Sequence, residues 1–396
     1  MTYVAPGDPH ELARSVRAGF ADHYGREASV VGRAPGRVNL MGEHTDYNHG
    51  LVLPVALPHA TYAAARLRDD PADGLVRVAS AQQAEPWEGQ LAAVGPGTVD
   101  GWAAYAAGMV WALHERGHEI PGVDLYVDST VPLGAGLSSS AALECSVGVA
   151  VAVALGLPLT PELRRDLVSA GMAAETEIVG APTGGMDQTI AMLGEAGAAL
   201  LIDFDLPEDR GRSTQVRLGL AGHSLLVTDT RVSHALVDGG YGQRRADCEE
   251  AAAVLGLSSL RDADLDAVAR IADDRVRRRA RHVVTEIARV RECVDALAAG
   301  DLDSLGRLFA DSHLSMRDDF EISCPELDVA VAVAVEAGAV AARMTGGGFG
   351  GSSVAVVPDE RVDAVARAID AAFALEGFTP PHHLRAEPSP GAGREG

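Results

Sequence analysis

The chain has 396 residues and a formal net charge of −23 at pH 7, with 47% hydrophobic and 22% charged residues. This composition predicts a folded, water-soluble chain of two domains, and its negative charge argues against nucleic acid or an anionic membrane as a non-specific partner. No apolar run approaches the roughly 20 residues that span a bilayer, and residues 1–8 lack the pattern of a signal peptide. We therefore expect no membrane association and a cytoplasmic location.

Lysine is absent, so all 33 residues counted as lysine or arginine are arginines. This excludes the Walker-type phosphate loop, the strand lysine of protein kinases and lysine Schiff-base chemistry, because each needs a lysine at the reacting group. If the chain binds a nucleotide, backbone amides, arginine and Mg²⁺ must neutralise the phosphates. The 4 cysteines are widely spaced with no Cys-x-x-Cys pair, which predicts reduced and mostly buried thiols.

The first 50 residues predict a helix, a strand and a polar loop. Asp8-Pro9 is typical of a helix start, and apolar residues then recur at helical spacing between residues 12 and 24. Residues 28–33 predict a short strand. The segment 36–50 places arginine, glutamate, histidine, aspartate and two asparagines between glycines, which favours a polar binding loop over a core element.

Strands are predicted next at residues 51–57, 61–68 and 75–79, followed by a helix at 100–117. An alternating strand, 123–127, then leads into a glycine- and serine-rich turn at 132–144 and a buried helix at 141–155. The first amides of a helix lack internal partners and lie at the positive end of its dipole, so this turn should bind an anion such as phosphate. The residues of the turn that we assign to this site are Gly134, Ala135, Gly136, Leu137, Ser138, Ser139, Ser140 and Ala141.

A helix capped at Thr160 is predicted to reach about Val179, and residues 180–188 then place Asp187 in a tight turn. A buried strand is expected at 198–204. The acidic and polar composition around 206–213 marks the expected boundary between an N-terminal domain, 1–205, and a C-terminal domain, 206–396.

Strands and helices also follow one another in the second half of the chain. Its predicted strands lie at 224–228, 340–344 and 353–357, and its predicted helices near 238–255, 259–272, 274–298, 301–319, 325–337 and 360–375. Each half is therefore expected to be an α+β domain. The glycine loop 346–351 formally fits the dinucleotide fingerprint, but a strand and not a helix follows it. A backbone loop brought close to a ligand or to another loop is the better interpretation.

Together these segments resemble the galactokinases of the GHMP kinase superfamily (galactokinase, homoserine kinase, mevalonate kinase and phosphomevalonate kinase). The serine turn resembles the nucleotide loop of that superfamily, the glycine loop 346–351 its third motif, and residues 36–47 the galactokinase signature. Residues 185–188 and 388–393 are also similar, so the resemblance covers nearly the whole chain. Two local departures are His49, where an acid is usual, and Asp238-Gly239-Gly240 before Tyr241. The resemblance implies a two-domain α+β architecture with the active site in the cleft between the domains.

The resemblance also implies an activity, the ATP-dependent phosphorylation of the anomeric hydroxyl of α-D-galactose to galactose 1-phosphate. Glu43, His44 and Asp46 would hold sugar hydroxyls, with Gly185 and Tyr241 completing the pocket. Carboxylates accept hydrogen bonds and imidazole can accept or donate, so such a loop can distinguish hydroxyl stereochemistry. The alternative for the loop residues is a set of ion pairs that stabilise the loop itself.

In this resemblance Asp187 is the acid that faces the attacking hydroxyl, and Arg37 is its partner. A neighbouring guanidinium keeps a carboxylate ionised but makes it a weaker base. A loose phosphoryl-transfer transition state needs little early proton abstraction. Asp187 is therefore either a general base with late proton transfer, which we favour, or chiefly a group that orients the hydroxyl. Arg37 would also offset charge on the transferring phosphoryl group.

The resemblance further implies that Ser140 and Glu175 hold Mg²⁺, leaving room for phosphates and water. A solvated helix charge is the alternative for Glu175, because Glu177 lies close by on the same predicted helix. Trp102 and Tyr105 fall in the region that flanks the adenine in galactokinases, and core packing is the alternative for both.

Two other functions remain open at this point. One is a kinase of a related sugar such as N-acetylgalactosamine, arabinose or galacturonate, and the other is a non-catalytic sensor of galactose and ATP. The intact serine turn, Arg37 and Asp187 favour turnover. We expect small-molecule substrates as partners and a monomer or weak homodimer.

Overall fold

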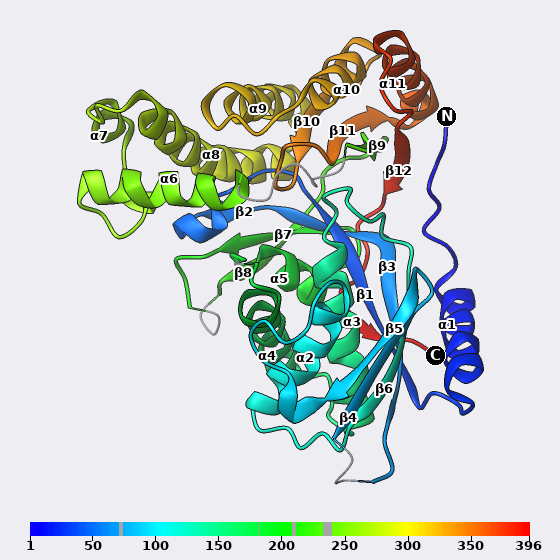
Figure 1. Ribbon diagram of the computed structural model, residues 1–396. Helices are drawn as coiled ribbons and strands as arrows, with labels where there is room; N and C mark the ends of the chain where they lie inside the picture. Colours follow the sequence, from blue (N-terminus) through cyan, green and yellow to red (C-terminus); the bar gives the residue numbers. More distant parts are fainter. Residues whose placement is uncertain (71–73, 182, 208–210, 233–239) are drawn as a thin grey trace.

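A computed structural model describes residues 1–70, 74–181, 183–207, 211–232 and 240–396. It has two lobes, one above the other in Figure 1, each built of a sheet covered by helices. The helices are α1 (Pro9–Tyr24), α2 (Ala103–Glu115), α3 (Ser139–Ala154), α4 (Pro161–Ala173), α5 (Met186–Leu193), α6 (Gly240–Leu255), α7 (Leu265–Ala269), α8 (Asp274–Ala299), α9 (Leu302–Leu314), α10 (Pro325–Glu336) and α11 (Val362–Glu376). The strands are β1 (Val30–Asn39), β2 (Leu51–Val52), β3 (Pro54–Leu67), β4 (Leu75–Ser80), β5 (Gln83–Gln90), β6 (Val123–Ser129), β7 (Ala198–Asp203), β8 (Ser213–Arg217), β9 (His223–Asp229), β10 (Ala341–Thr345), β11 (Ser352–Pro358), β12 (His382–Ala386) and β13 (Gly393–Arg394).

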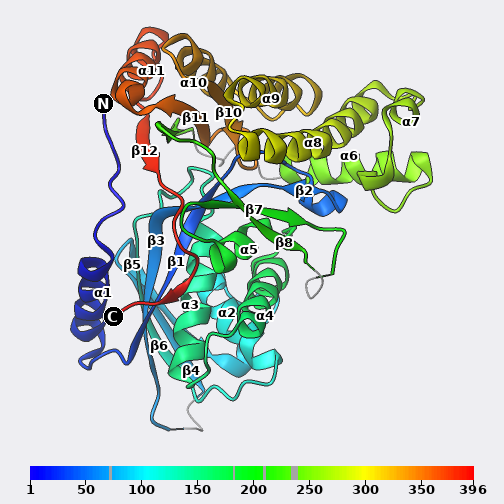
Figure 2. The same ribbon diagram turned by 180° about the vertical axis from the view of Figure 1, so that it is seen from behind.

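The lower lobe is organised on a six-stranded sheet with the order β13-β1-β3-β6-β4-β5. Helix α1 covers one face, and α2, α3, α4 and α5 gather on the other (Figures 1 and 2). Adjacent residues of a strand point to opposite faces. Accordingly, Val31 and Ala64 pack with α1, whereas Val30 and Ala65 pack with α2 and α3. Burial on both faces explains why β1 is buried along its whole length.

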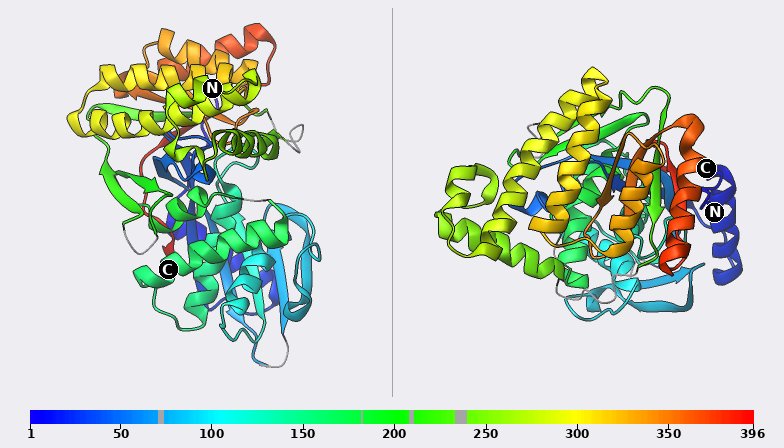
Figure 3. Two further views of the ribbon diagram at one scale, coloured as in Figure 1. Left: turned by 90° about the vertical axis from the view of Figure 1, so that its left-hand side faces the viewer. Right: turned by 90° about the horizontal axis from the view of Figure 1, so that it is seen from above.

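The upper lobe has a four-stranded antiparallel sheet with the order β10-β11-β9-β12. Helices α10 and α11 pack on it through Ala330, Phe373 and their neighbours, while α6, α7 and α8 extend to one side (Figure 3). A three-stranded sheet, β2-β7-β8, lies between the two lobes. The long amphipathic helix α8 packs against this middle region, with Val290 buried near Gly42.

The two α+β units expected from the sequence are confirmed, and most of the predicted elements are present within a few residues of their expected bounds. The boundary between residues 205 and 206 stays a prediction. Among the contacts that cross between the halves, β13 pairs with β1, and Tyr3 forms a β-bridge with His383 of β12. Both chain ends therefore tie one half to the other.

Several local predictions were wrong. Strand β1 continues to Asn39, so residues 36–39 of the expected loop are buried strand, paired with the start of β3. Asp187 lies in the first turn of helix α5 and not in a tight turn. Strand β5 was missed because its sequence, with Pro86, Gly89 and mostly exposed polar residues, lacks an apolar alternation. In each case sheet pairing or tertiary packing overrode the local pattern.

Within the described residues, no helix is both long and apolar enough to cross a membrane. The 4 cysteines are free thiols, three of them buried, as the sequence predicted. Helix α3 begins at Ser139, so Ser139 and Ser140 form part of its first turn. This start places the predicted anion-binding turn directly at the helix mouth.

Candidate active site

The predicted anion-binding turn connects β6 to α3 and has the conformation that its glycines allow. Gly134 and Gly136 have φ angles of 75° and 71°, and Ser138, which precedes the helix, is left-handed at 58°. Non-glycine residues rarely adopt this conformation without a functional reason. Helix α3 therefore presents its free amides at a tightly folded and partly exposed turn.

The glycine loop 346–351 supports this turn from the C-terminal half. A Cβ at Gly346 would lie 2.9 Å from the carbonyl oxygen of Gly136, and the Ser352 hydroxyl donates to the Ala135 carbonyl at 2.7 Å. The loop joins β10 to β11, so it is a strand-to-strand loop in contact with another loop, as the sequence predicted. Glycine is needed at position 346 because the two backbones touch.

Asp187 and Arg37 form a bidentate ion pair although 150 residues separate them. The Arg37 Nε and Nη2 groups each donate to a different Asp187 oxygen at 2.8 Å, and Nη1 donates to the Gly136 carbonyl at 2.6 Å. The Ser138 hydroxyl also donates to Asp187 Oδ2. Both Asp187 oxygens thus accept hydrogen bonds, and these contacts fix the carboxylate at the cavity wall. The contact from Ser138 is one that sequence reasoning missed.

Ser140 and Glu175, the predicted metal ligands, lie side by side. Glu175 belongs to a π-helical segment that continues α4, and it accepts hydrogen bonds from the Ser140 hydroxyl and from the Gln188 amide, the latter at 2.6 Å. Burial, and next the negative charge of Asp187, raise the pKa of Glu175 to about 7. One carboxylate and one hydroxyl are oxygen donors of the kind that Mg²⁺ takes in partial protein shells.

A second carboxylate, Glu144, lies behind this pair and was missed by sequence reasoning. It is fully buried in α3, and the Gln188 amide that donates to Glu175 also donates to Glu144 Oε2 at 3.0 Å. Its Oε1 has no partner, and burial raises the pKa of the carboxyl. The available signal was a lone acid within an apolar helix sequence. Among the described residues, no group of three or more His, Cys, Asp or Glu side chains could hold a metal ion.

All but one of the predicted sugar residues line one cavity of about 490 Å³ together with the Arg37–Asp187 pair; Gly185 does not. Glu43 is buried, Asp46 lies opposite Gly184, and Tyr241 comes from the start of α6. Burial is the chief cause that raises the pKa of Asp46 to about 6. The predicted residues that this cavity brings together are Arg37, Glu43, His44, Asp46, Glu175, Asp187 and Tyr241.

His44 forms the wall of this cavity with both ring nitrogens in use. Nε2 lies 3.0 Å from the Gly347 carbonyl, which can only accept, so Nε2 carries the hydrogen and Nδ1 accepts from the Tyr47 hydroxyl at 2.8 Å. Burial lowers the pKa of His44 to about 3, so the ring is neutral. Its ring centroid lies 5.1 Å from that of Tyr241. The predicted contact of His44 with a sugar hydroxyl stays a prediction.

Other predicted residues lie at the edges of the site. Trp102 lines a small hollow of about 60 Å³ with Ser139 and Leu133. Burial and the carboxylates of Glu175 and Glu144 raise the pKa of Tyr105 to about 12. Gly185, with a φ of 94°, precedes α5, and its backbone N–H donates a hydrogen bond to the Thr183 hydroxyl. Contacts of these residues with substrates stay predictions.

Of the two departures from the family pattern, only one can be described fully. His49 has a left-handed φ of 56°, and its carbonyl accepts from Arg261 at 3.1 Å. This left-handed turn closes the short helix Asp46–Asn48. In the other departure, Asp238 and Gly239 lie outside the described residues, and Gly240 is the first residue of α6.

Family models match three parts of the chain: the galactokinase galactose-binding signature at residues 18–67, the GHMP kinase N-terminal domain at 104–195 and the GHMP kinase C-terminal domain at 293–375. The chain is 48% identical over 392 residues to a galactokinase of Streptomyces coelicolor, covering 97% of this chain and 98% of the relative. A galactokinase of Mycobacterium tuberculosis is 44% identical, with 91% and 97% covered.

Comparison with solved structures also finds a galactokinase. A Lactococcus lactis galactokinase complexed with galactose superimposes with a TM-score of 0.88 at 32% identity, covering 96% of this chain and 98% of that one. A mevalonate kinase gives a TM-score of 0.66 at 16% identity, covering 91% and 99%. At that lower identity the likeness shows the shared fold.

Proposed function

The chain belongs to the galactokinase family of the GHMP kinases, and from this premise we propose how it carries out the ATP-dependent phosphorylation of galactose. The γ-phosphoryl group of ATP passes to the anomeric hydroxyl of α-D-galactose within the 490 Å³ cavity. The observation that carries the proposal is that the Arg37–Asp187 ion pair shares this cavity with Glu43 and Asp46, while Arg37 also contacts the predicted phosphate-binding turn.

Asp187 accepts the proton of the attacking hydroxyl. The bond between the bridging oxygen and the γ-phosphorus of ATP breaks while a bond forms from that phosphorus to the anomeric oxygen, and ADP leaves. Arg37 and Ser138 hold the Asp187 carboxylate in place by hydrogen bonds, and in a loose phosphoryl-transfer transition state the proton moves late. Before this proton transfer, Asp187 also orients the attacking hydroxyl.

The amides at the mouth of α3 hold the triphosphate, and Arg37 offsets its charge. Ser140 and Glu175 would hold Mg²⁺. Because no group of three or more His, Cys, Asp or Glu side chains among the described residues could hold a metal ion, phosphates and water would complete the shell. When bound, Mg²⁺ neutralises the β- and γ-phosphates. The hollow at Trp102 lies on the side of the turn where the adenine would fit.

Glu43 and Asp46 accept hydrogen bonds from sugar hydroxyls, with His44 and Tyr241 forming the wall and Gly185 bounding the pocket near α5. Carboxylates at fixed positions favour one arrangement of hydroxyls, because a misplaced hydroxyl leaves a buried acceptor unpaired. We propose in addition that the protein acts in the cytoplasm as a monomer or weak homodimer. Its net charge of −23 supports the absence of a nucleic-acid or anionic-membrane partner.

Gly184→Ala is expected to weaken galactose binding. A Cβ at position 184 would lie 2.0 Å from Asp46 Oδ2 and 2.3 Å from Asp46 Cγ, so the carboxylate must move. We expect KM for galactose to rise roughly tenfold, the effect of one lost hydrogen bond to a charged group, with KM for ATP unchanged. Gly95→Ala is the control, because a Cβ there meets nothing within 4 Å. Unchanged galactose KM in Gly184→Ala would remove Asp46 from the sugar site.

A coupled ADP-release assay tests the reaction itself. Galactose, N-acetylgalactosamine, arabinose, galacturonate and glucose are compared, and the phosphorylated carbon of each product is located by NMR. We expect the highest kcat/KM with galactose and phosphate on C1 only. A higher value for another sugar, or phosphate on another carbon, would contradict the proposal.

A further inference from the structure

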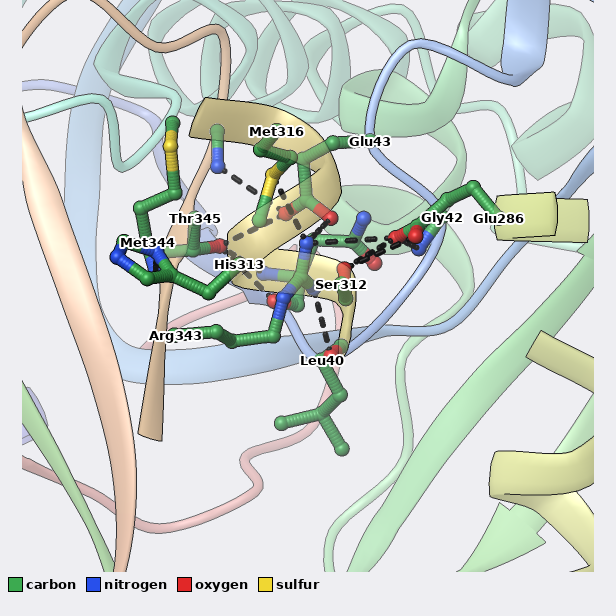
Figure 4. Close-up of polar contacts among 12 residues, drawn as sticks. Leu40, Gly42, Glu43, Glu286, Ser312, His313, Met316, Arg343, Met344 and Thr345 are labelled. Carbon is green, nitrogen blue, oxygen red and sulfur yellow. Dashed lines mark hydrogen bonds and ion pairs between the residues drawn. The ribbon is translucent and has the colours of Figure 1, made fainter. Parts of the chain in front are cut away.

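Figure 4 shows a buried cluster of alternating charges. One of its members, Glu43, also lines the sugar cavity. Glu43, Arg343 and Glu286 are all 1% exposed or less, and they come from the loop after β1, from β10 and from α8. Arg343 Nη2 binds Glu43 Oε2 and lies 3.4 Å from Glu286 Oε1, while its Nη1 donates to the Leu40 carbonyl at 2.7 Å. The guanidinium therefore joins the two carboxylates.

Glu286 fixes this arrangement from α8. It accepts hydrogen bonds from the Gly42 amide, the Ser312 hydroxyl and Arg289 Nε, at 2.8–2.9 Å. With Arg289 included, the cluster contains two carboxylates and two guanidiniums and is electrically balanced. A buried charge is destabilising unless it is paired. Without Arg343, the Glu43 carboxylate would be buried near the Glu286 carboxylate and would lose the cation that contacts it.

The other oxygen of Glu43 is held by β10 and the glycine loop that follows it. Glu43 Oε1 accepts from the Thr345 hydroxyl and from the Gly346 amide, both at 3.2 Å. The Glu43 carbonyl accepts from His282 Nε2 at 3.2 Å. Every contact named here that fixes this side chain comes from the C-terminal half. Glu43 still lines the cavity. A carboxylate has about four acceptor positions, so Glu43 can accept a further hydrogen bond from a sugar hydroxyl.

We propose that Arg343 is a positioning residue for sugar binding: it holds the Glu43 carboxyl group in place at the cavity wall, and the affinity for galactose depends on this contact. The inference rests on the proposed sugar role of Glu43. It predicts that a residue without access to the cavity controls galactose affinity but not ATP affinity, because the predicted phosphate-binding turn is formed by other residues. A merely structural ion pair would instead lower stability and leave the galactose affinity of the folded protein unchanged.

The test measures galactose binding by calorimetry, together with KM for each substrate and the melting temperature, in Arg343→Met, Arg343→Lys and Glu43→Gln. We expect Arg343→Met to raise the galactose Kd and KM by roughly tenfold to a hundredfold, the range for breaking a buried charge-assisted contact. KM for ATP should stay within about twofold of the wild-type value, because the substitution leaves the predicted phosphate-binding turn unchanged. Arg343→Lys keeps the charge but not the planar fork, so it should fall between wild type and Arg343→Met. It also provides a measurement if Arg343→Met does not fold.

Two controls separate positioning from stability. Asp124→Asn weakens the contacts of another fully buried carboxylate, which Arg77 holds at 2.7 and 2.8 Å in the lower sheet and which Arg68 and Arg26 also contact. It should lower the melting temperature without changing galactose Kd. The double variant Glu43→Gln/Arg343→Met should bind galactose no more weakly than Glu43→Gln alone, because Arg343 acts through Glu43. Additive effects, or unchanged galactose Kd in both Arg343 variants while Glu43→Gln binds weakly, would overturn the inference and leave the proposed function intact. Unchanged binding in Glu43→Gln would overturn the sugar site and the inference with it.

Discussion

Asp187→Ala is expected to lower kcat at least about a hundredfold, the low end for a positioned acid–base group, while ATP binding persists. The carboxylate is the group that the Arg37 fork and the Ser138 hydroxyl hold at the cavity wall. Its removal leaves the attacking hydroxyl without a proton acceptor or an orienting partner. The predicted phosphate-binding turn is not changed directly. Steady-state kcat from ADP release and ATP binding by calorimetry measure the two parts separately.

Two further variants sharpen this result. Asp187→Asn keeps the shape and one acceptor oxygen but removes the charge, so it distinguishes orientation from proton acceptance. If orientation dominates, Asp187→Asn should retain clearly more activity than Asp187→Ala. Ser138→Ala removes one donor to Asp187 Oδ2 and keeps both from Arg37, so we expect a smaller loss of kcat, on the order of threefold to tenfold. A kcat close to wild type in Asp187→Ala would remove this residue from the chemistry.

Local sequence explains much of the site because its elements are short and contiguous. The serine turn is specified by two glycines placed between a strand and a helix, and Gly134 and Gly136 have the positive φ angles that such a turn requires. Glu43, His44 and Asp46 are close in sequence, so one loop brings them to one cavity. These features could be predicted without knowledge of the tertiary structure.

The partners of these residues could not be found in the same way. The contacts from Arg37 to Asp187 and from Arg343 to Glu43 join residues 150 and 300 positions apart, and only the topology decides that they meet. The resemblance to galactokinases supplied the first pair, and neither the resemblance nor the pattern supplied the second. The remaining signal was Arg343 itself, a charged residue in the buried strand Ala341–Thr345. A buried charge requires a partner, but the sequence does not name it.

Ser140→Ala and Glu175→Gln are expected to raise the Mg²⁺ concentration needed for half-maximal activity by roughly tenfold or more, and Glu175→Gln should also lower kcat. The Ser140 hydroxyl and the Glu175 carboxylate are in contact at the mouth of α3. Each substitution therefore removes one of the few protein ligands of the proposed metal site. A missing charged ligand is the larger loss, because Mg²⁺ prefers hard anionic oxygen. One measurement is activity against Mg²⁺ concentration at constant ATP concentration. The other is a titration of the protein–ATP complex with Mn²⁺, followed by electron paramagnetic resonance.

Glu177→Gln is the matched control, because it removes an acid from the same π-helical segment but at an exposed position. It should leave both titrations unchanged. The buried amide of Gln188 donates to Glu175 and to Glu144, so Gln188→Leu should loosen the Glu175 side chain and shift the Mn²⁺ titration in the same direction by a smaller factor. Identical metal titrations in wild type, Ser140→Ala and Glu175→Gln would move the metal away from the mouth of α3, and the triphosphate would then have to be neutralised mainly by Arg37 and the backbone amides.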